Sequence, residues 1–229
     1  GTWSPPGRLP EGFGAGNARV QVDASGTALA IWATQNAVMA ARFDPTRASW
    51  LQPAMLSGSG AAEPRLALNA AGDGLAVWSR VVSGRHSLEA MHYSAAARTW
   101  MGPDVLPVET WLDPRLDVGV DEGGNAVILW TRGPGGACLQ QCLYALRYVA
   151  VTGEWTLQET LSAPTQVALG PSVAIDRFGN VVVAWGQRLP DYAPAGYLSA
   201  VQSRTWTGAP LAPTVTEASA AAGAVALAF

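Results

Sequence analysis

The feature that most constrains the fold of this chain is a repeat with a period of about 50 residues, in which each copy ends in an aromatic residue. Three segments align without a gap and close on tryptophan, namely 18–32, 64–78 and 171–185. Residues 114–130 form the same unit with two extra residues, and 213–229 form a fifth copy that ends in phenylalanine. Such a repeat predicts a domain assembled from stacked copies of one supersecondary unit.

A second series of tryptophans follows the first with the same period. The first series consists of Trp32, Trp78, Trp130 and Trp185, and the second of Trp3, Trp50, Trp100, Trp155 and Trp206, so that only Trp111 lies outside both. Two independent markers with one period indicate that each tryptophan has a fixed packing position in its unit. We therefore expect the tryptophans of the first series to be buried.

Each unit has the pattern of four β-strands. A first strand such as 19–22 leads into an Asp/Asn-x-x-Gly turn, which supplies the residues that a hairpin needs. The second strand is apolar on both faces, as in 181–185, and is therefore predicted to be buried on both sides. The third strand is more amphipathic, and a short fourth strand follows the second tryptophan. We place the third strands at 38–43, 88–93, 143–148 and 197–201.

Four-stranded units of this kind resemble the blades of β-propellers, which bury both faces only against their neighbours. The resemblance covers essentially the whole chain. Residues 43–50 also resemble a degenerate Asp-box, the turn motif of sialidase-like propellers. The corresponding segments 93–100, 148–155 and 202–206 lack the Ser-x-Asp-x-Gly core of that motif.

We predict an all-β fold, a single β-propeller domain over residues 1–229 with five blades. The predicted blades are 17–56, 57–106, 107–161, 162–211, and a last blade that combines 212–229 with 1–16. Building the last blade from both termini would hide sheet edges that otherwise invite aggregation. The alternatives are a piece of a larger ring, or closure by dimerisation.

The charge pattern and hydropathy exclude two classes of partner. The net charge is −3, the chain has 14 cationic side chains, all arginine, and no basic stripe is present, so we expect no nucleic-acid partner. No apolar run approaches the ~20 residues that span a bilayer, so we expect no membrane-spanning segment. No signal peptide is visible in this chain.

The two cysteines, Cys138 and Cys142, lie four positions apart in a loop. A local disulfide is the first interpretation and two free thiols the second. A zinc site normally needs four ligands, and no second pair lies at ligand spacing, so we expect no metal and no cofactor. A disulfide favours an oxidising compartment, and we expect an extracellular or cell-envelope location.

Candidate ligand-binding residues lie in the long loops at one face of the predicted ring, where a rigid scaffold presents variable segments. They are Arg80, Arg132, Gln187, Arg188, Glu109, Trp111, Asp113, Asp191 and Tyr192. Arginine forks suit carboxylate or sulfate, and an exposed tryptophan beside carboxylates suits a sugar ring. The alternative is that the arginines bond to loop carbonyls and that the loop aromatics pack on a neighbouring blade.

Catalytic motifs are hard to assemble from these residues. His86 stands alone in a loop, and His92 takes the strand position of Arg42 and Arg147, which indicates a surface-strand residue. A glycosidase needs only two carboxylates, which Glu63, Glu109, Asp113 and Asp191 could supply. A sialidase-like site would also use Arg80, Arg132, Arg188 and Tyr192.

We therefore expect a non-catalytic binding module of a secreted or cell-envelope protein, and not an enzyme. Its ligand would be a glycan or another protein bound at the long-loop face. The alternative is a glycoside hydrolase or sialidase-like enzyme at the same face. A structural protein–protein scaffold is the third possibility.

Overall fold

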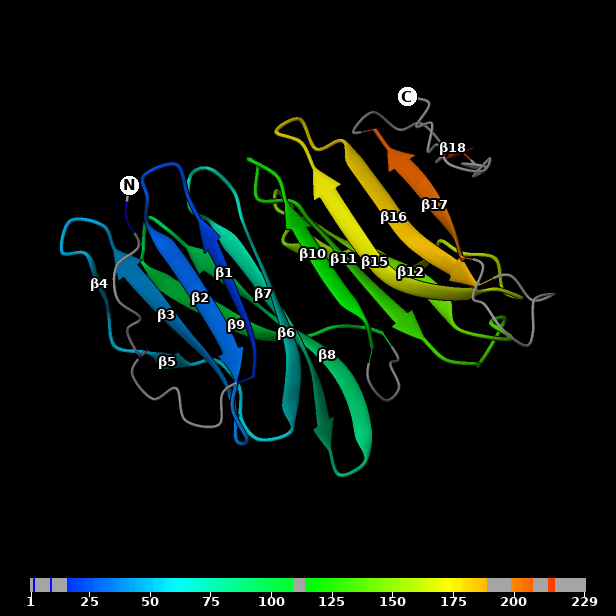
Figure 1. Cartoon of the computed structure of the whole chain (residues 1–229), viewed down its shortest axis with the longest axis horizontal. Helices are drawn as coiled ribbons and strands as arrows, with labels where there is room; N and C mark the ends of the chain where they lie inside the picture. Colours follow the sequence, from blue (N-terminus) through cyan, green and yellow to red (C-terminus); the bar gives the residue numbers. More distant parts are fainter. Residues whose placement is uncertain are drawn as a thin grey trace.

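The computed structural model describes residues 2, 9, 16–108, 114–188, 199–207 and 214–216, and in these residues it contains β-strands and turns but no helix (Figure 1). The strands form four antiparallel sheets that follow one another along the chain. Sheet 1 consists of β1 (Gly16–Val22), β2 (Ala28–Ala33), β3 (Val38–Asp44), β4 (Ser49–Trp50) and β5 (Ala54–Met55). Sheet 2 consists of β6 (Ala61–Leu68), β7 (Gly74–Val82), β8 (Arg85–Ser94) and β9 (Thr99–Val105).

The second half of the chain repeats this arrangement. Sheet 3 consists of β10 (Leu116–Val120), β11 (Ala126–Arg132), β12 (Cys142–Val149), β13 (Glu154–Trp155) and β14 (Glu159–Thr160). Sheet 4 consists of β15 (Val167–Ile175), β16 (Val181–Arg188), β17 (Ser199–Trp206) and β18 (Thr214–Thr216). The all-β propeller architecture predicted from the repeat is therefore confirmed.

The turn between the first two strands of each sheet follows from the Asp/Asn-x-x-Gly pattern. The glycines adopt left-handed φ angles, +83° at Gly26 and +82° at Gly179, which L residues with a Cβ rarely adopt. The leading acid or amide completes the turn, since the Asp23 carboxylate accepts hydrogen bonds from the backbone N–H groups of Ser25 and Thr27 at 2.8 and 3.0 Å. We call the side of the molecule with these turns the turn face, and the opposite side, with the longer connections, the loop face.

The hydrophobic core lies between successive sheets rather than inside any one of them. The first strand of each sheet packs against the first strand of the next, so that β6 lies between β1 and β10, and β10 between β6 and β15. Alternation along β6 directs Leu66 toward sheet 1 and Ala67 toward sheet 3. We call each interface between two successive sheets a seam. A sheet of this kind buries both faces only when it has a neighbour on each side.

The tryptophans of the first series hold the predicted buried positions. Trp32, Trp78, Trp130 and Trp185 are at most 3% exposed, and each pairs with the equivalent residue of the third strand of its sheet. Trp130, for example, lies in the core between sheets 2 and 3. Burial of one large aromatic side chain per sheet contributes much of the apolar area that holds neighbouring sheets together.

The assignment of Trp206 to the second series is wrong. Trp206 ends β17 opposite Val181, which is the position of Tyr148 opposite Ala126 in sheet 3, whereas Trp155 lies in the fourth strand. The third strand of sheet 4 therefore begins later than predicted, and the short β18 pairs with it as the fourth strand. Sheet 4 thus extends to residue 216, beyond the predicted boundary at 211.

The predicted fifth blade consists of 212–229 and 1–16, and of these residues the structure describes only 2, 9, 16 and 214–216. The blade count of five therefore stays a prediction.

The two outermost faces of the four sheets expose positions that the seams bury. On β1, Val20 is 58% exposed, although the equivalent Leu66 is 5% exposed. On β16, Val182 is 44% exposed, although the equivalent Val127 is 5% exposed. The same repeat positions are therefore apolar whether or not a described neighbour covers them.

Candidate functional site

The first strands of three sheets contain a bulge close to their loop-face ends. The pairing register shifts between Gly16 and Arg19 in β1, between Ala62 and Arg65 in β6, and between Leu169 and Ser172 in β15. Asn17, Glu63 and Gly170 have φ angles of 53°, 53° and 48° at these bulges. Glycine adopts this conformation freely and asparagine tolerates it, but for glutamate it costs on the order of 1–3 kcal/mol. Strained bulges of this kind reorient side chains and are frequent beside active sites.

The bulges bring together a polar group that we call the axial cluster. Its members are Asn17, Arg19, Glu63, Arg65 and Asp117, which come from the first strands of sheets 1, 2 and 3. The side-chain amide of Asn17 donates to Glu63 Oε1 at 2.8 Å, and Arg65 Nη2 lies 3.5 Å from Glu63 Oε2. Both oxygens of the Glu63 carboxylate are therefore held by donors, and its orientation is fixed.

Arg65 connects the Glu63 carboxylate to the backbone of sheet 3. Its Nε donates to the Leu116 carbonyl at 2.8 Å, which links β6 to β10. Burial, reinforced by the charge of Arg19, lowers the pKa of Arg65, whereas the nearby Glu63 and Asp117 carboxylates act in the opposite direction. The guanidinium still stays charged, because arginine titrates far above neutral pH.

The axial cluster remains open to solvent in part. The side chain of Glu63 is 23% exposed and that of Arg65 14%, while Arg19 and Asn17 are exposed. A carboxylate fixed by two donors beside exposed arginine and amide groups can accept a proton or attack an electrophilic carbon. The cluster can also bind sugar hydroxyl or carboxylate groups through its donors.

The predicted site residue Arg80 lies in a partly buried ion pair. Its Nη1 is 2.9 Å from Glu89 Oε1, and its Nε donates to the carbonyl of Ser59 at 3.3 Å. Glu89 is 4% exposed and also accepts a hydrogen bond from Trp78 Nε1 at 3.0 Å. These bonds fix the end of β7 in the seam between sheets 1 and 2. The sequence reasoning missed Glu89, although a carboxylate at a strand position held by Met39 in sheet 1 was a usable signal.

The other described site residues lie at the loop-face ends of their strands. Arg132 ends β11, and a Cβ on Gly135 would lie 2.9 Å from its Nη2, so the following loop passes close to the guanidinium. Gln187 is buried in β16 at 2% exposure, next to the exposed Arg188. The remaining predicted residues, Glu109, Trp111, Asp113, Asp191 and Tyr192, lie outside the described residues.

Cys138 and Cys142 form a disulfide in the structure, and both are buried. The described residues contain no group of three or more His, Cys, Asp or Glu side chains that could hold a metal ion. The described part of the chain also contains no helix with the length and hydropathy that a membrane crossing requires.

The chain is similar to solved β-propeller structures, although no protein-family model and no curated protein sequence matches it. A protein of unknown function from Dyadobacter fermentans has a TM-score of 0.61 at 11% identity, over 90% of this chain and 70% of its own. A GH93 alpha-L-arabinofuranosidase from Fusarium graminearum, in complex with arabinobiose, has a TM-score of 0.58 at 15% identity, over 93% and 68%. A PL25 ulvan lyase bound to -[GlcA(1-4)Rha3S]- has a TM-score of 0.56 at 13% identity, over 86% and 56%.

The likeness establishes the fold. It also corrects two expectations, since the similar structures with a named activity, the arabinofuranosidase and the ulvan lyase, are enzymes that act on glycans. The expectation of a non-catalytic binding module, and of no enzymatic activity, is therefore wrong as the leading interpretation.

Proposed function

We propose that this protein is a glycoside hydrolase whose site is the axial cluster on the loop face. The observation that carries the proposal is Glu63, a partly exposed carboxylate held by Asn17 and Arg65 at a strained bulge. A strained backbone persists only where the surroundings enforce it, and here it aims an acidic side chain at the accessible end of the inner strands. The similarity of the fold to an arabinofuranosidase supports the choice of reaction class.

Glu63 is assigned the role of base or nucleophile. Hydrogen bonds from Asn17 and Arg65 fix the orientation of this carboxylate, and a fixed carboxylate can activate water or attack the anomeric carbon. Hydrolysis also needs an acid that gives a proton to the leaving oxygen. We assign that role to one of the predicted loop carboxylates Glu109, Asp113 and Asp191.

Asp117 is a poorer choice for the acid. Its Oδ2 accepts a hydrogen bond from the backbone N–H of Val173 at 2.8 Å, so this carboxylate already has a partner within the fold. Its bond to β15 instead aligns the first strands of sheets 3 and 4. Substrate contacts are assigned to Arg19, and to Trp111 and Tyr192 as stacking surfaces for sugar rings.

A secreted or cell-envelope location fits this function. Glycan polymers lie outside the cytoplasm in most settings, and the disulfide between Cys138 and Cys142 persists in oxidising compartments.

The test compares the wild type with Glu63→Gln on a panel of polysaccharides and chromogenic glycosides, with release of reducing ends as the measure. Removal of the carboxylate is expected to lower the rate by about 10²–10⁴-fold, the usual contribution of a general base. Glu154→Gln is the matched control, because Glu154 is exposed on β13 of the outer strands.

Three outcomes contradict the proposal. If the Glu63→Gln variant releases reducing ends at the wild-type rate, Glu63 takes no part in the reaction. Products with the ultraviolet absorbance of an unsaturated uronate indicate elimination rather than hydrolysis, and a wild type that releases no product from any glycan removes the enzymatic assignment altogether.

A further inference from the structure

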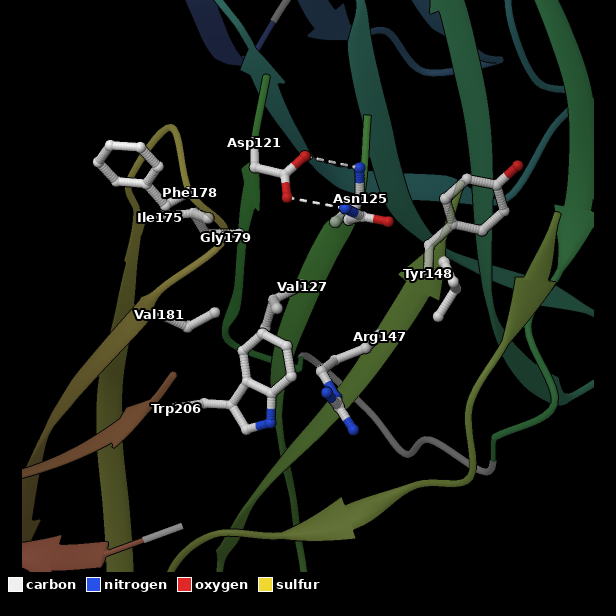
Figure 2. Close-up of a pocket in the computed structure, with 12 residues that line it drawn as sticks. Asp121, Asn125, Val127, Arg147, Tyr148, Ile175, Phe178, Gly179, Val181 and Trp206 are labelled. Atoms are coloured by element: carbon white, nitrogen blue, oxygen red, sulfur yellow. Dashed lines mark hydrogen bonds between the residues drawn. The ribbon is translucent and has the colours of Figure 1, made fainter. Parts of the chain in front are cut away.

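A cleft opens on the turn face between sheets 3 and 4, away from the axial cluster. Its volume is about 270 Å³, near the ~300 Å³ lower end of small-molecule pockets, so that it suits one ring rather than a chain of them. Val127 and Val181 line it together with Arg147 and Trp206. Figure 2 shows residues of sheet 4 facing those of sheet 3 across the cleft, with Asp121 and Asn125 at one end and Arg147 beside Trp206 at the other.

Among the described residues, this seam has no counterpart of an aromatic residue that fills the previous seam. Between sheets 2 and 3, the His92 ring lies 4.2 Å from Tyr148 and 6.1 Å from Trp155. Between sheets 3 and 4, Arg147 takes the place of His92 and lies 4.5 Å from the ring of Trp206. No described residue of sheet 4 takes the place of Trp155, and the space stays open.

Phe178 at the mouth of the cleft is the second sign of a binding site. It is 70% exposed in the turn between β15 and β16, and it lines the cleft. The three equivalent turn positions are occupied by the small residues Ser25, Ala71 and Gly123. A large exposed aromatic side chain at this one turn has no packing role in the described structure, whereas it would cover an apolar ligand face.

The polar groups of the cleft favour an anion at one end. The Nε of Arg147 is buried without a hydrogen-bond partner among the described residues, and its Nη2 forms an ion pair with the partly exposed carboxylate of Glu159 at 3.5 Å. The carboxylate of Asp121, in contrast, is fully engaged by Asn125 at 2.9 and 2.8 Å. The guanidinium of Arg177 lies 4.6 Å from the Phe178 ring and adds a second positive charge near the mouth.

We propose that this cleft binds a single acidic sugar residue of hexuronate type, with the carboxylate on Arg147 and the ring against the aromatic faces of Trp206 and Phe178. The site lies on the opposite face from the axial cluster and does not depend on hydrolysis there. It would hold an acidic glycan on the protein through a contact separate from the reacting linkage.

The test is titration of the full chain with glucuronate, with glucose and benzoate as neutral and non-sugar probes, followed by calorimetry and saturation-transfer NMR. Glucuronate is expected to bind more tightly than either of the other two. Arg147→Met is expected to lower the affinity for glucuronate about tenfold or more, since it removes a charged hydrogen bond. Phe178→Ser, which introduces the residue of the first turn, is expected to lower it several-fold without changing the fold.

The control is Val151→Ser, because Val151 is a 91% exposed apolar residue on a neighbouring turn of sheet 3 and does not line the cleft. Equal affinity of wild type and Phe178→Ser overturns the proposal, as does equal binding of glucose or stronger binding of benzoate. Glucuronate binding that is lost in Arg19→Ala but kept in Phe178→Ser places the sugar at the axial cluster and also overturns it.

Discussion

The seam between sheets 2 and 3 and the seam between sheets 3 and 4 are built at the same repeat positions, yet the first is filled and the second is hollow. In the first, the His92 ring packs at a tilt against Tyr148, and Trp155 Nε1 donates to Asp104 at 3.3 Å. In the second, Arg147 lies over Trp206 beside an open cleft. The repeat therefore sets which positions of two neighbouring sheets contact each other. The side chains at two or three of these positions then decide whether the seam is a packed core or contains a cleft.

The largest expected difference between the two seams concerns their tryptophans. Trp130 is fully buried between sheets 2 and 3, so Trp130→Ala is expected to cost about 3–5 kcal/mol in the free energy of unfolding. Trp206→Ala is expected to cost clearly less, because its ring already faces a cavity. Urea denaturation of both variants measures the difference, and equal losses would show that the hollow seam is packed as tightly as the filled one.

The hollow seam is tight at its inner end, which a smaller change can test. A Cβ on Gly119 in β10 would lie 2.9 Å from Ile175 Cγ1 in β15. Gly119→Ala is therefore expected to destabilise the protein by about 1–3 kcal/mol through overpacking. Gly133→Ala is the control, because a Cβ there meets no atom within 4 Å. A neutral Gly119→Ala, measured by thermal denaturation, would mean that the two sheets separate easily along their whole length.

The filled seam should respond to pH. Burial lowers the pKa of His92 below its ordinary value of 6.5, and the Asp104 carboxylate offsets only part of this. Because the unfolded chain then binds more protons, the stability contributed by neutral His92 is fully present above the unfolded pKa. It is lost as the pH falls through that value.

The measurement compares the wild type with His92→Phe, which keeps a ring against Tyr148. The wild type should lose more unfolding free energy than this variant when the pH is lowered from neutral to mildly acidic. His86→Asn, which removes the other histidine, is the matched control. A His92→Phe variant with the full wild-type pH dependence would assign the effect to other groups.

Much of the fold follows from local sequence. The turns with left-handed glycines at positions such as Gly26, and the burial of Trp32 and its equivalents, are set by residues close together in the chain. Trp206 was assigned to the wrong strand because the loop before β17 breaks the period, and spacing alone does not reveal where pairing resumes. His92 was expected on the surface, but the next sheet covers it, and its side chain is 19% exposed.

The candidate site is less visible from sequence because it depends on backbone geometry and on contacts between sheets. No local sequence pattern predicts the positive φ angle of Glu63. None predicts that Glu63 accepts a hydrogen bond from Asn17, which lies 46 positions earlier in the chain. The ion pair of Arg80 and Glu89 likewise depends on strand register. The expectation of a non-catalytic module was drawn from missing motifs, and a site assembled from several strands leaves no such motif.

The exposed valines at the two ends of the stack have a consequence for assembly. Because each sheet packs on the next through opposite faces, Val20 and Val182 belong to two unlike apolar ends. Contacts of this heterologous kind either close into a ring or propagate without limit into a filament. Solubility at high concentration therefore requires that both ends be capped, and polar substitutions there should reduce fibre growth in any preparation in which they are bare.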